Sequence, residues 1–188
     1  SVLLTAPDSK ENLSISSNGS VVIGDARSLT GNINISSVGD ITINNASNLA
    51  GKLELDNVRA IPGHDIIVLE ASKAKSVDVK SVGAFIANIN GGLKSAETIE
   101  VQAAEDSTIY AIEDVERVVS LIANNNTNNE IIFTIDINSM KELTLNGTVP
   151  LLVKADGEDL DRTTVTTSNS STSAISITGA NTDLSDIA

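Results

Sequence analysis

Carboxylate side chains at one recurring strand position are the residues of this sequence best placed to do chemistry together. Glu54, Asp78 and Glu100 each lie between two apolar residues of a short alternating segment. Because alternation with period two sends neighbouring side chains to opposite faces, we expect the three carboxylates to point outward. On consecutive coils of a stacked structure they would lie about 5 Å apart, where like charges repel.

Two interpretations of this acidic column are open. The first is a metal site for a divalent cation, with Ca²⁺ the best match, because hard cations need several oxygen ligands. The second is a solvated acidic stripe whose repulsion is relieved by nearby lysines, namely Lys52, Lys75 and Lys80. No other cofactor is indicated. Along the whole chain the outward column is expected to contain Ser14, Asn34, Glu54, Asp78, Glu100, Ser120 and Thr144.

The only histidine, His64, lies in the segment "RAIPGHDII". Histidine can serve as a metal ligand or as a general base near neutral pH. However, the sequence has no GxSxG, HExxH or P-loop motif that would place a reaction partner at a known spacing. We therefore expect an exposed loop histidine and no catalytic residues.

The elements that must position these side chains come from an internal repeat. Asn12 to Gly31 reads "NLSISSNGSVVIGDARSLTG", and Asn32 to Gly51 follows without a gap as "NINISSVGDITINNASNLAG". Each block contains a short alternating strand, a glycine, a second alternating strand, a polar turn and a closing glycine. The apolar pairs of these strands are Leu13 and Ile15, Val21 and Ile23, Ile33 and Ile35, and Ile41 and Ile43.

The same phase continues down the chain at steps of 20–24 residues. The later first-strand pairs are expected at Leu53 and Leu55, Val77 and Val79, Ile99 and Val101, Val119 and Leu121, Leu143 and Leu145, and Ile175 and Ile177. Before the last pair, the segment "TTVTT" is expected to form one further coil with a weaker apolar pattern. Periods of this length indicate stacked units that cannot bury their apolar faces alone. The repeat therefore predicts about eight or nine coils.

Three repeat architectures compete for this period. Leucine-rich repeats would show an asparagine or cysteine at one fixed slot, and β-propellers would need longer units with aromatic signatures. A parallel solenoid needs only a strand and a turn, twice per coil, and parallel crossovers are right-handed. We expect an all-β, right-handed parallel β-solenoid (β-helix) forming one module over residues 1–188, cut from a longer chain, with 1–11 and 178–188 as caps or cut ends.

Composition narrows the function. With 12 basic and 25 acidic residues the net charge is −13, which disfavours nucleic-acid binding and docking on anionic lipid. The chain has no cysteine and no tryptophan and has one tyrosine. The sequence shows no signal peptide, membrane-inserted segment or lipidation motif. The missing aromatic sugar platforms argue against a polysaccharide-cleaving enzyme with paired carboxylates.

Several segments resemble known repeat families. "SLTGNINISSVGDITI", "LKSAETIEVQAAEDSTI" and "IEDVERVVSLIANN" look like the repetitive segments of bacterial S-layer proteins secreted through a type I system. "ISSVGDITINNASNLAGKLEL" is similar to the hemagglutinin repeats of filamentous adhesins. The resemblance, over about Asn12 to Leu152, implies a structural role outside a bacterial cell and transfers no catalytic residue.

Three functions follow as expectations. The first is a non-catalytic structural module of a secreted or cell-surface bacterial protein that contributes to S-layer lattice assembly. Its partners would be copies of itself or neighbouring modules of the same protein. The second is an adhesin stalk or binding module that recognises a glycan or a host protein. The third, disfavoured by the composition, is a polysaccharide-active enzyme.

Overall fold

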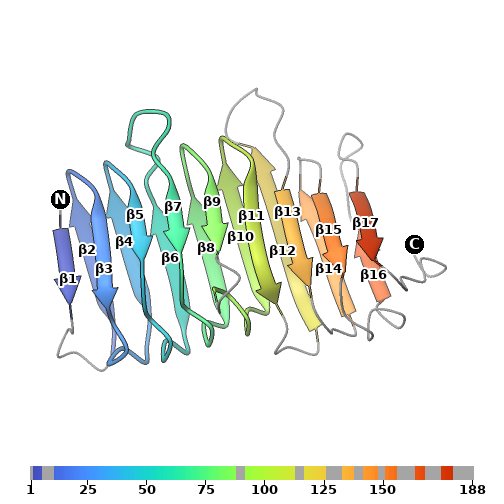
Figure 1. Cartoon of the computed structure of the whole chain (residues 1–188), viewed down its shortest axis with the longest axis horizontal. Helices are drawn as coiled ribbons and strands as arrows, with labels where there is room; N and C mark the ends of the chain where they lie inside the picture. Colours follow the sequence, from blue (N-terminus) through green and yellow to red (C-terminus); the bar gives the residue numbers. More distant parts are fainter. Residues whose placement is uncertain are drawn as a thin grey trace.

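The part of the chain that the structure describes consists mainly of β-strands (Figure 1). The structure is a computed structural model that describes residues 2–5, 11–87, 92–112, 117–125, 133–137, 142–147, 151–155, 164–167 and 175–179. Side-chain burial is described within residues 2–4, 11–87 and 92–109. This described part of the chain contains no helix with the length and apolar character needed to span a bilayer.

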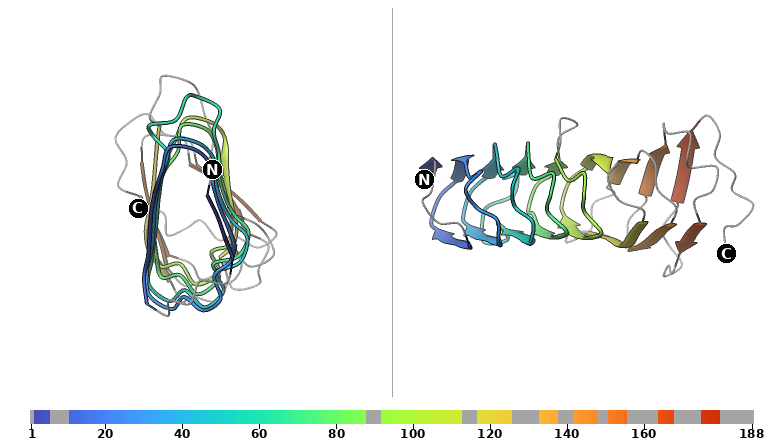
Figure 2. Two further views of the ribbon diagram at one scale, coloured as in Figure 1. Left: turned by 90° about the vertical axis from the view of Figure 1, so that its left-hand side faces the viewer. Right: turned by 90° about the horizontal axis from the view of Figure 1, so that it is seen from below.

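The strands form two parallel sheets that enclose one narrow interior (Figure 2). Sheet A has nine strands: β1 (Val2–Thr5), β3 (Val21–Asp25), β5 (Ile41–Ile43), β7 (Ile66–Val68), β9 (Phe85–Ala87), β11 (Ser107–Ile112), β13 (Phe133–Ile137), β15 (Leu151–Ala155) and β17 (Ile175–Gly179). Sheet B has eight: β2 (Leu13–Ser17), β4 (Ile33–Ser37), β6 (Lys52–Asp56), β8 (Ser76–Lys80), β10 (Thr98–Ala103), β12 (Arg117–Asn125), β14 (Glu142–Gly147) and β16 (Thr164–Thr167).

Each coil contributes one strand to each sheet, so consecutive strands of the chain alternate between the sheets. In Figure 1 the chain advances from left to right, rising through sheet B at the back and descending through sheet A at the front. This is a right-handed path, as expected for parallel crossovers. The predicted all-β, right-handed parallel β-solenoid is confirmed.

The aliphatic ladders of the interior match the repeat in the sequence. In sheet B, Leu13 pairs with Ile33 and Ile33 pairs with Leu53, and the register continues to Val77 and Ile99. Alternation within each strand places these residues inside, and Ile33 and Leu53 are fully buried. The other fully enclosed large side chains include Ile23, Leu29, Ile35, Ile41, Ile43, Leu49, Leu55, Ile66 and Phe85. Stacked β-branched and aliphatic residues therefore form the core.

The turn that follows sheet A has a recurring hydrogen-bonding pattern. The side chains of Asp25, Asn45 and Glu70 each accept a hydrogen bond from the backbone N–H two residues later. The alanine that follows each of these residues is buried, and its carbonyl accepts a bond from the N–H three residues on, as from Leu29 to Ala26 at 2.9 Å. The local turn chemistry thus closes each coil in the same way.

The turn that leads from sheet B into sheet A contains a recurring Ser-x-Gly motif. Ser37 Oγ accepts a hydrogen bond from the N–H of Gly39 at 3.1 Å, and Ser81 Oγ does the same for Gly83 at 3.2 Å. A Cβ at position 39 would lie 2.7 Å from the backbone nitrogen of Ser20 on the preceding coil. Glycine is required here because adjacent coils approach through their backbones.

Eight or nine coils are expected; about five turns lie in the most continuously described part of the chain, from β2 to β11, and the later strands bring the stack to nine strands in sheet A and eight in sheet B. One detail of the repeat differs from the sequence prediction: Ile175 and Ile177 do not continue the first-strand series. They lie in β17 of sheet A and pair with Leu151 and Val153, while "TTVTT" supplies β16 of sheet B.

The register between β10 and β12 also differs from the prediction. Ile99 pairs with Leu121 and Val101 pairs with Ala123, so the expected pairing of Ile99 with Val119 is wrong by two residues. The register shifts again between β12 and β14, after Val118. A two-residue slip keeps every side chain on its own face, so the alternation in the sequence does not reveal it.

Candidate functional site

The acidic column lies on the outer side of sheet B as the sequence predicts. Glu54 of β6 pairs with Asp78 of β8, and Asp78 pairs with Glu100 of β10. Glu54 and Asp78 are half-buried, and Glu100 is exposed. Three carboxylates therefore stand on consecutive strands, at the strand spacing of about 4.8 Å.

One end of this column differs from the prediction. Ser14 and Asn34 occupy the expected positions before Glu54. Beyond Glu100, however, the next residues in register are Ile122 and Asn146, not Ser120 and Thr144. The cause is the two-residue slip at β12, so the polar column is interrupted by an isoleucine position after the third carboxylate.

Lys52 forms ion pairs with the first two carboxylates of the column. Its Nζ lies 3.1 Å from Glu54 Oε2 and 3.2 Å from Asp78 Oδ2. The hydrogen bond to Glu54 raises the pKa of Lys52; burial opposes this shift, while the hydrogen bond and the charge of Asp78 reinforce it. Lys75 instead pairs with Glu97 at 3.1 Å. The expected relief of the acidic stripe by lysine thus has a direct structural basis at Lys52.

A cation site at Glu54, Asp78 and Glu100 would have to compete with Lys52. Within the described residues, no three His, Cys, Asp or Glu side chains are grouped so that they could hold a metal ion. Ca²⁺ binding requires several oxygen ligands around one point. It would therefore require the Lys52 ammonium to move away from the two carboxylates, and the calcium site stays a prediction.

His64 is positioned by the fold rather than freely exposed. Its Nδ1 lies 2.9 Å from Asp40 Oδ1 on the preceding coil, and its side chain retains only 30% of its accessible surface. The backbone N–H of Asp65 donates to the same Asp40 oxygen at 3.0 Å. Burial acts to raise the pKa of Asp40, but the hydrogen bonds from His64 and Asp65 outweigh it and hold that pKa below its usual value.

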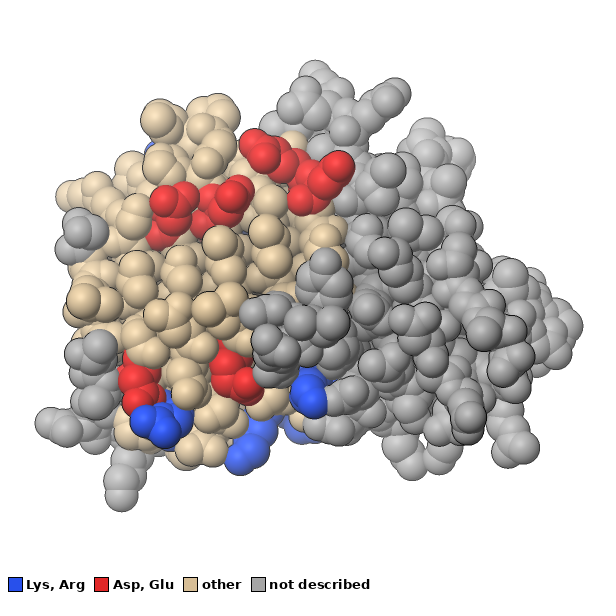
Figure 3. Space-filling model, in the orientation of Figure 1, with Lys and Arg blue, Asp and Glu red and all other residues tan. Residues whose placement is uncertain are grey.

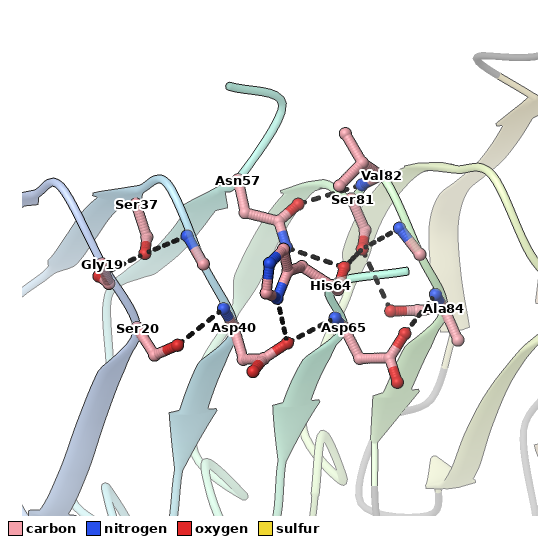
Figure 4. A network of polar contacts seen from close by, with 12 residues as sticks. Gly19, Ser20, Ser37, Asp40, Asn57, His64, Asp65, Ser81, Val82 and Ala84 are labelled. Atoms are coloured by element: carbon pink, nitrogen blue, oxygen red, sulfur yellow. Dashed lines mark hydrogen bonds and ion pairs between the residues drawn. The ribbon is translucent and has the colours of Figure 1, made fainter. Parts of the chain in front are cut away.

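The order of these groups does not suit nucleophilic catalysis. Asp40 lies in the middle, between His64 and Ser20, whose Oγ accepts a bond from the N–H of Asp40 at 3.2 Å (Figure 4). In a Ser-His-Asp triad the imidazole lies between the hydroxyl and the carboxylate, because it must take the proton of the nucleophile. The arrangement here fastens one coil to the next.

A buried polar stack beside His64 was not anticipated from the sequence. Ser37, Asn57 and Ser81 occupy equivalent places on three successive coils and are all within 1% of complete burial. Ser37 Oγ donates to the carbonyl of Gly19 at 2.9 Å, and Asn57 Nδ2 donates to the carbonyl of His64 at 2.9 Å (Figure 4). Asn57 Oδ1 also accepts from the N–H of Val82 at 3.0 Å.

These bonds satisfy backbone groups at a corner where the sheet ladder ends. The signal in the sequence is the Ser-x-Gly spacing, seen as "SNG", "SVG" and "SVG" at residues 17, 37 and 81. The polar groups around His64 and in the buried stack are thus used in hydrogen bonds within and between coils. Comparison of the chain with known proteins finds no matching family model, no matching curated protein and no matching solved structure.

Proposed function

We propose that this chain is a non-catalytic structural module of a bacterial cell-surface protein, and that it contributes to lattice assembly by self-association. The observation that carries the proposal is the in-register stacking of aliphatic ladders through both sheets. Each coil is held by its neighbours, so the module is a rod whose length is set by the number of coils. Such a rod suits a spacer or lattice element.

The polar groups at the corners support the same function. Asp40 bonds to His64 and Asp65 of the next coil, and Asn57 accepts a hydrogen bond from Val82 of the coil after its own, so these groups do not converge on a space for a substrate. The resemblance to S-layer repeats gives the extracellular bacterial setting, and the net charge of −13 suits a surface exposed to solvent.

Self-association tests this function directly. Sedimentation velocity over a wide concentration range, with Ca²⁺ and with a chelator, should show reversible oligomers larger than the monomer of 19.5 kDa. A strict monomer at every concentration and in both buffers would contradict the lattice function. A larger assembly with Ca²⁺ than with the chelator would additionally support the predicted cation site.

An adhesin or binding module is the second candidate, and one observation favours it. The segment between β6 and β7 projects from the end of the coil (Figure 1). It exposes Val58 and Ile61, which retain 45% and 72% of their accessible surface. Exposed apolar side chains on a projecting loop can anchor a partner. Saturable binding of the monomer to a host protein or glycan, lost in Ile61→Asp, would favour this function over lattice assembly.

A further inference from the structure

The two broad outer faces of the solenoid differ in charge. The outer side of sheet B carries Lys52, Glu54, Asp56, Asp78, Lys80 and Glu100. The central outward column of sheet A has no charged residue from β1 to β11 and consists of Leu3, Val22, Thr42, Ile67, Ile86 and Thr108, which pair in register. Five of these six are half-buried although they point outward, and Leu3 is 71% exposed. From β1 to β11, the central column of sheet A therefore presents an uncharged, largely aliphatic strip.

Charges flank this strip unequally on its two long edges (Figure 3). At the edge where the chain enters sheet A, the residues that directly precede strands include Asp40, Asp65 and Asp106, and this edge is acidic. The opposite edge, where the chain leaves sheet A, mixes both signs through Asp25, Arg27, Glu70, Lys73 and Lys94. Figure 3 shows a row of acidic side chains along the upper edge and a mixture of acidic and basic side chains along the lower edge.

We propose that two copies of this chain dock face to face through sheet A, with parallel rods related by a twofold axis along the solenoid. The inference rests on the proposed self-association and names its surface. Nine strands spaced about 4.8 Å apart and on average roughly four residues long give a face of roughly 600 Å². That is at the lower end of the range of about 600–1,000 Å² per partner that a standard interface buries.

The edge charges select the orientation. A twofold axis along the solenoid places the acidic edge of each copy opposite the mixed edge of the other, where Arg27 and Lys73 lie. A twofold axis across the strip, which makes the rods antiparallel, places acidic edge against acidic edge. Like charges in apposition disfavour the second arrangement, so the parallel pair is selected.

A charge placed on the strip tests the surface. Ile67→Lys puts an ammonium at the centre of the outward column, where the free rod can keep it in solvent, so the fold should persist by circular dichroism. The dissociation constant from sedimentation should rise at least tenfold, because pairing would bury two unpaired charges. Asn34→Lys adds the same charge to the exposed face of sheet B and is the matched control, for which no change is expected.

Cross-linking tests the orientation, and the chain offers no native cysteine to interfere. Packed sheets lie about 10 Å apart, too far for a disulfide, so a bis-maleimide of that length is the probe. In parallel rods every residue of the column faces its own copy, and both Val22→Cys and Ile86→Cys should give covalent dimers. In antiparallel rods only Ile86→Cys, on the fifth of nine strands, would do so.

The outcomes separate this inference from the proposed function. Loss of association in Ile67→Lys together with both cross-links supports the parallel face-to-face pair. A cross-link at Ile86→Cys alone overturns the orientation. Association that survives in Ile67→Lys, with neither cross-link formed, overturns the docking face but leaves the lattice function standing. A wild-type chain that never self-associates overturns both.

Discussion

Shortening a single ladder residue tests the physical basis of the fold. Ile35 is fully buried between Ile15 and Leu55 in the ladder of sheet B. Ile35→Ala removes three methyl or methylene groups, worth about 0.8 kcal/mol each in transfer free energy, or roughly 2.4 kcal/mol. The cavity left in a stacked ladder adds to this, so the free energy of unfolding should fall by about 2–5 kcal/mol.

The variant series makes this prediction quantitative. Ile35→Val should cost only about 0.5–1.5 kcal/mol, whereas Ile35→Asp should prevent folding because it buries an unpaired charge. Asn34→Ala, one residue away on the outer face, is the control and should change stability by less than about 0.5 kcal/mol. Urea unfolding followed by circular dichroism measures all four. Equal costs for Ile35→Ala and Asn34→Ala, or an unchanged melting temperature for Ile35→Asp, would refute the ladder.

Three further predictions concern an ion pair, a carboxylate between two coils and a turn glycine. Lys52→Met should lower the free energy of unfolding by about 0.5 kcal/mol at neutral pH, because Glu54 and Asp78 are left to repel each other across a partly exposed surface. The loss should be smaller in high salt, which screens this repulsion. Urea titrations at two salt concentrations measure the effect, and an increase in stability would contradict it. The pKa of Asp40 is lowered by folding, so its stabilising contribution is present above the ordinary aspartate pKa of about 3.9 and is lost as the pH falls through the lower folded value. Asp40→Asn should therefore show a shallower loss of melting temperature on acidification, and an unchanged acid limb would count against the His64 and Asp65 contacts. Gly39→Ala should lower the free energy of unfolding by about 1–3 kcal/mol, because its Cβ would press on the backbone of Ser20. Gly63→Ala is the comparison: its Cβ would meet open space, so only the strain of a φ of 88° should lower its stability.

The fold could be predicted from the sequence wherever the repeat was regular. The ladder from Leu13 and Ile15 to Ile99 and Val101 follows from alternation and from the spacing of 20–24 residues. Beyond that point the predicted pairing of Leu121 with Leu145 is confirmed, but the pairing of Ile99 with Val119 was wrong by two residues. Alternation does not reveal a slip by an even number of residues, and β12 is nine residues long where its neighbours have six. Nor could alternation assign Ile175 to sheet A, since both sheets present the same apolar pattern to the interior.

The candidate site, too, could be predicted only in part from the sequence. The register of Glu54, Asp78 and Glu100 could be predicted, because it depends only on which strand positions face outward. The place of Lys52 between two carboxylates depends on side-chain conformation, which a spacing argument does not contain. The buried stack of Ser37, Asn57 and Ser81 was missed because serine and asparagine at a corner look the same in sequence as solvated turn residues.

The central claim is that coils stack in parallel and in register, with a step of about 20 residues. Methyl-resolved nuclear Overhauser spectroscopy of a selectively labelled sample tests it most directly. Cross-peaks are expected between Ile15 and Ile35 and between Ile35 and Leu55, pairs that are adjacent rungs of one ladder. Absence of these cross-peaks, together with the close Hα–Hα contacts typical of antiparallel pairs, would contradict the solenoid.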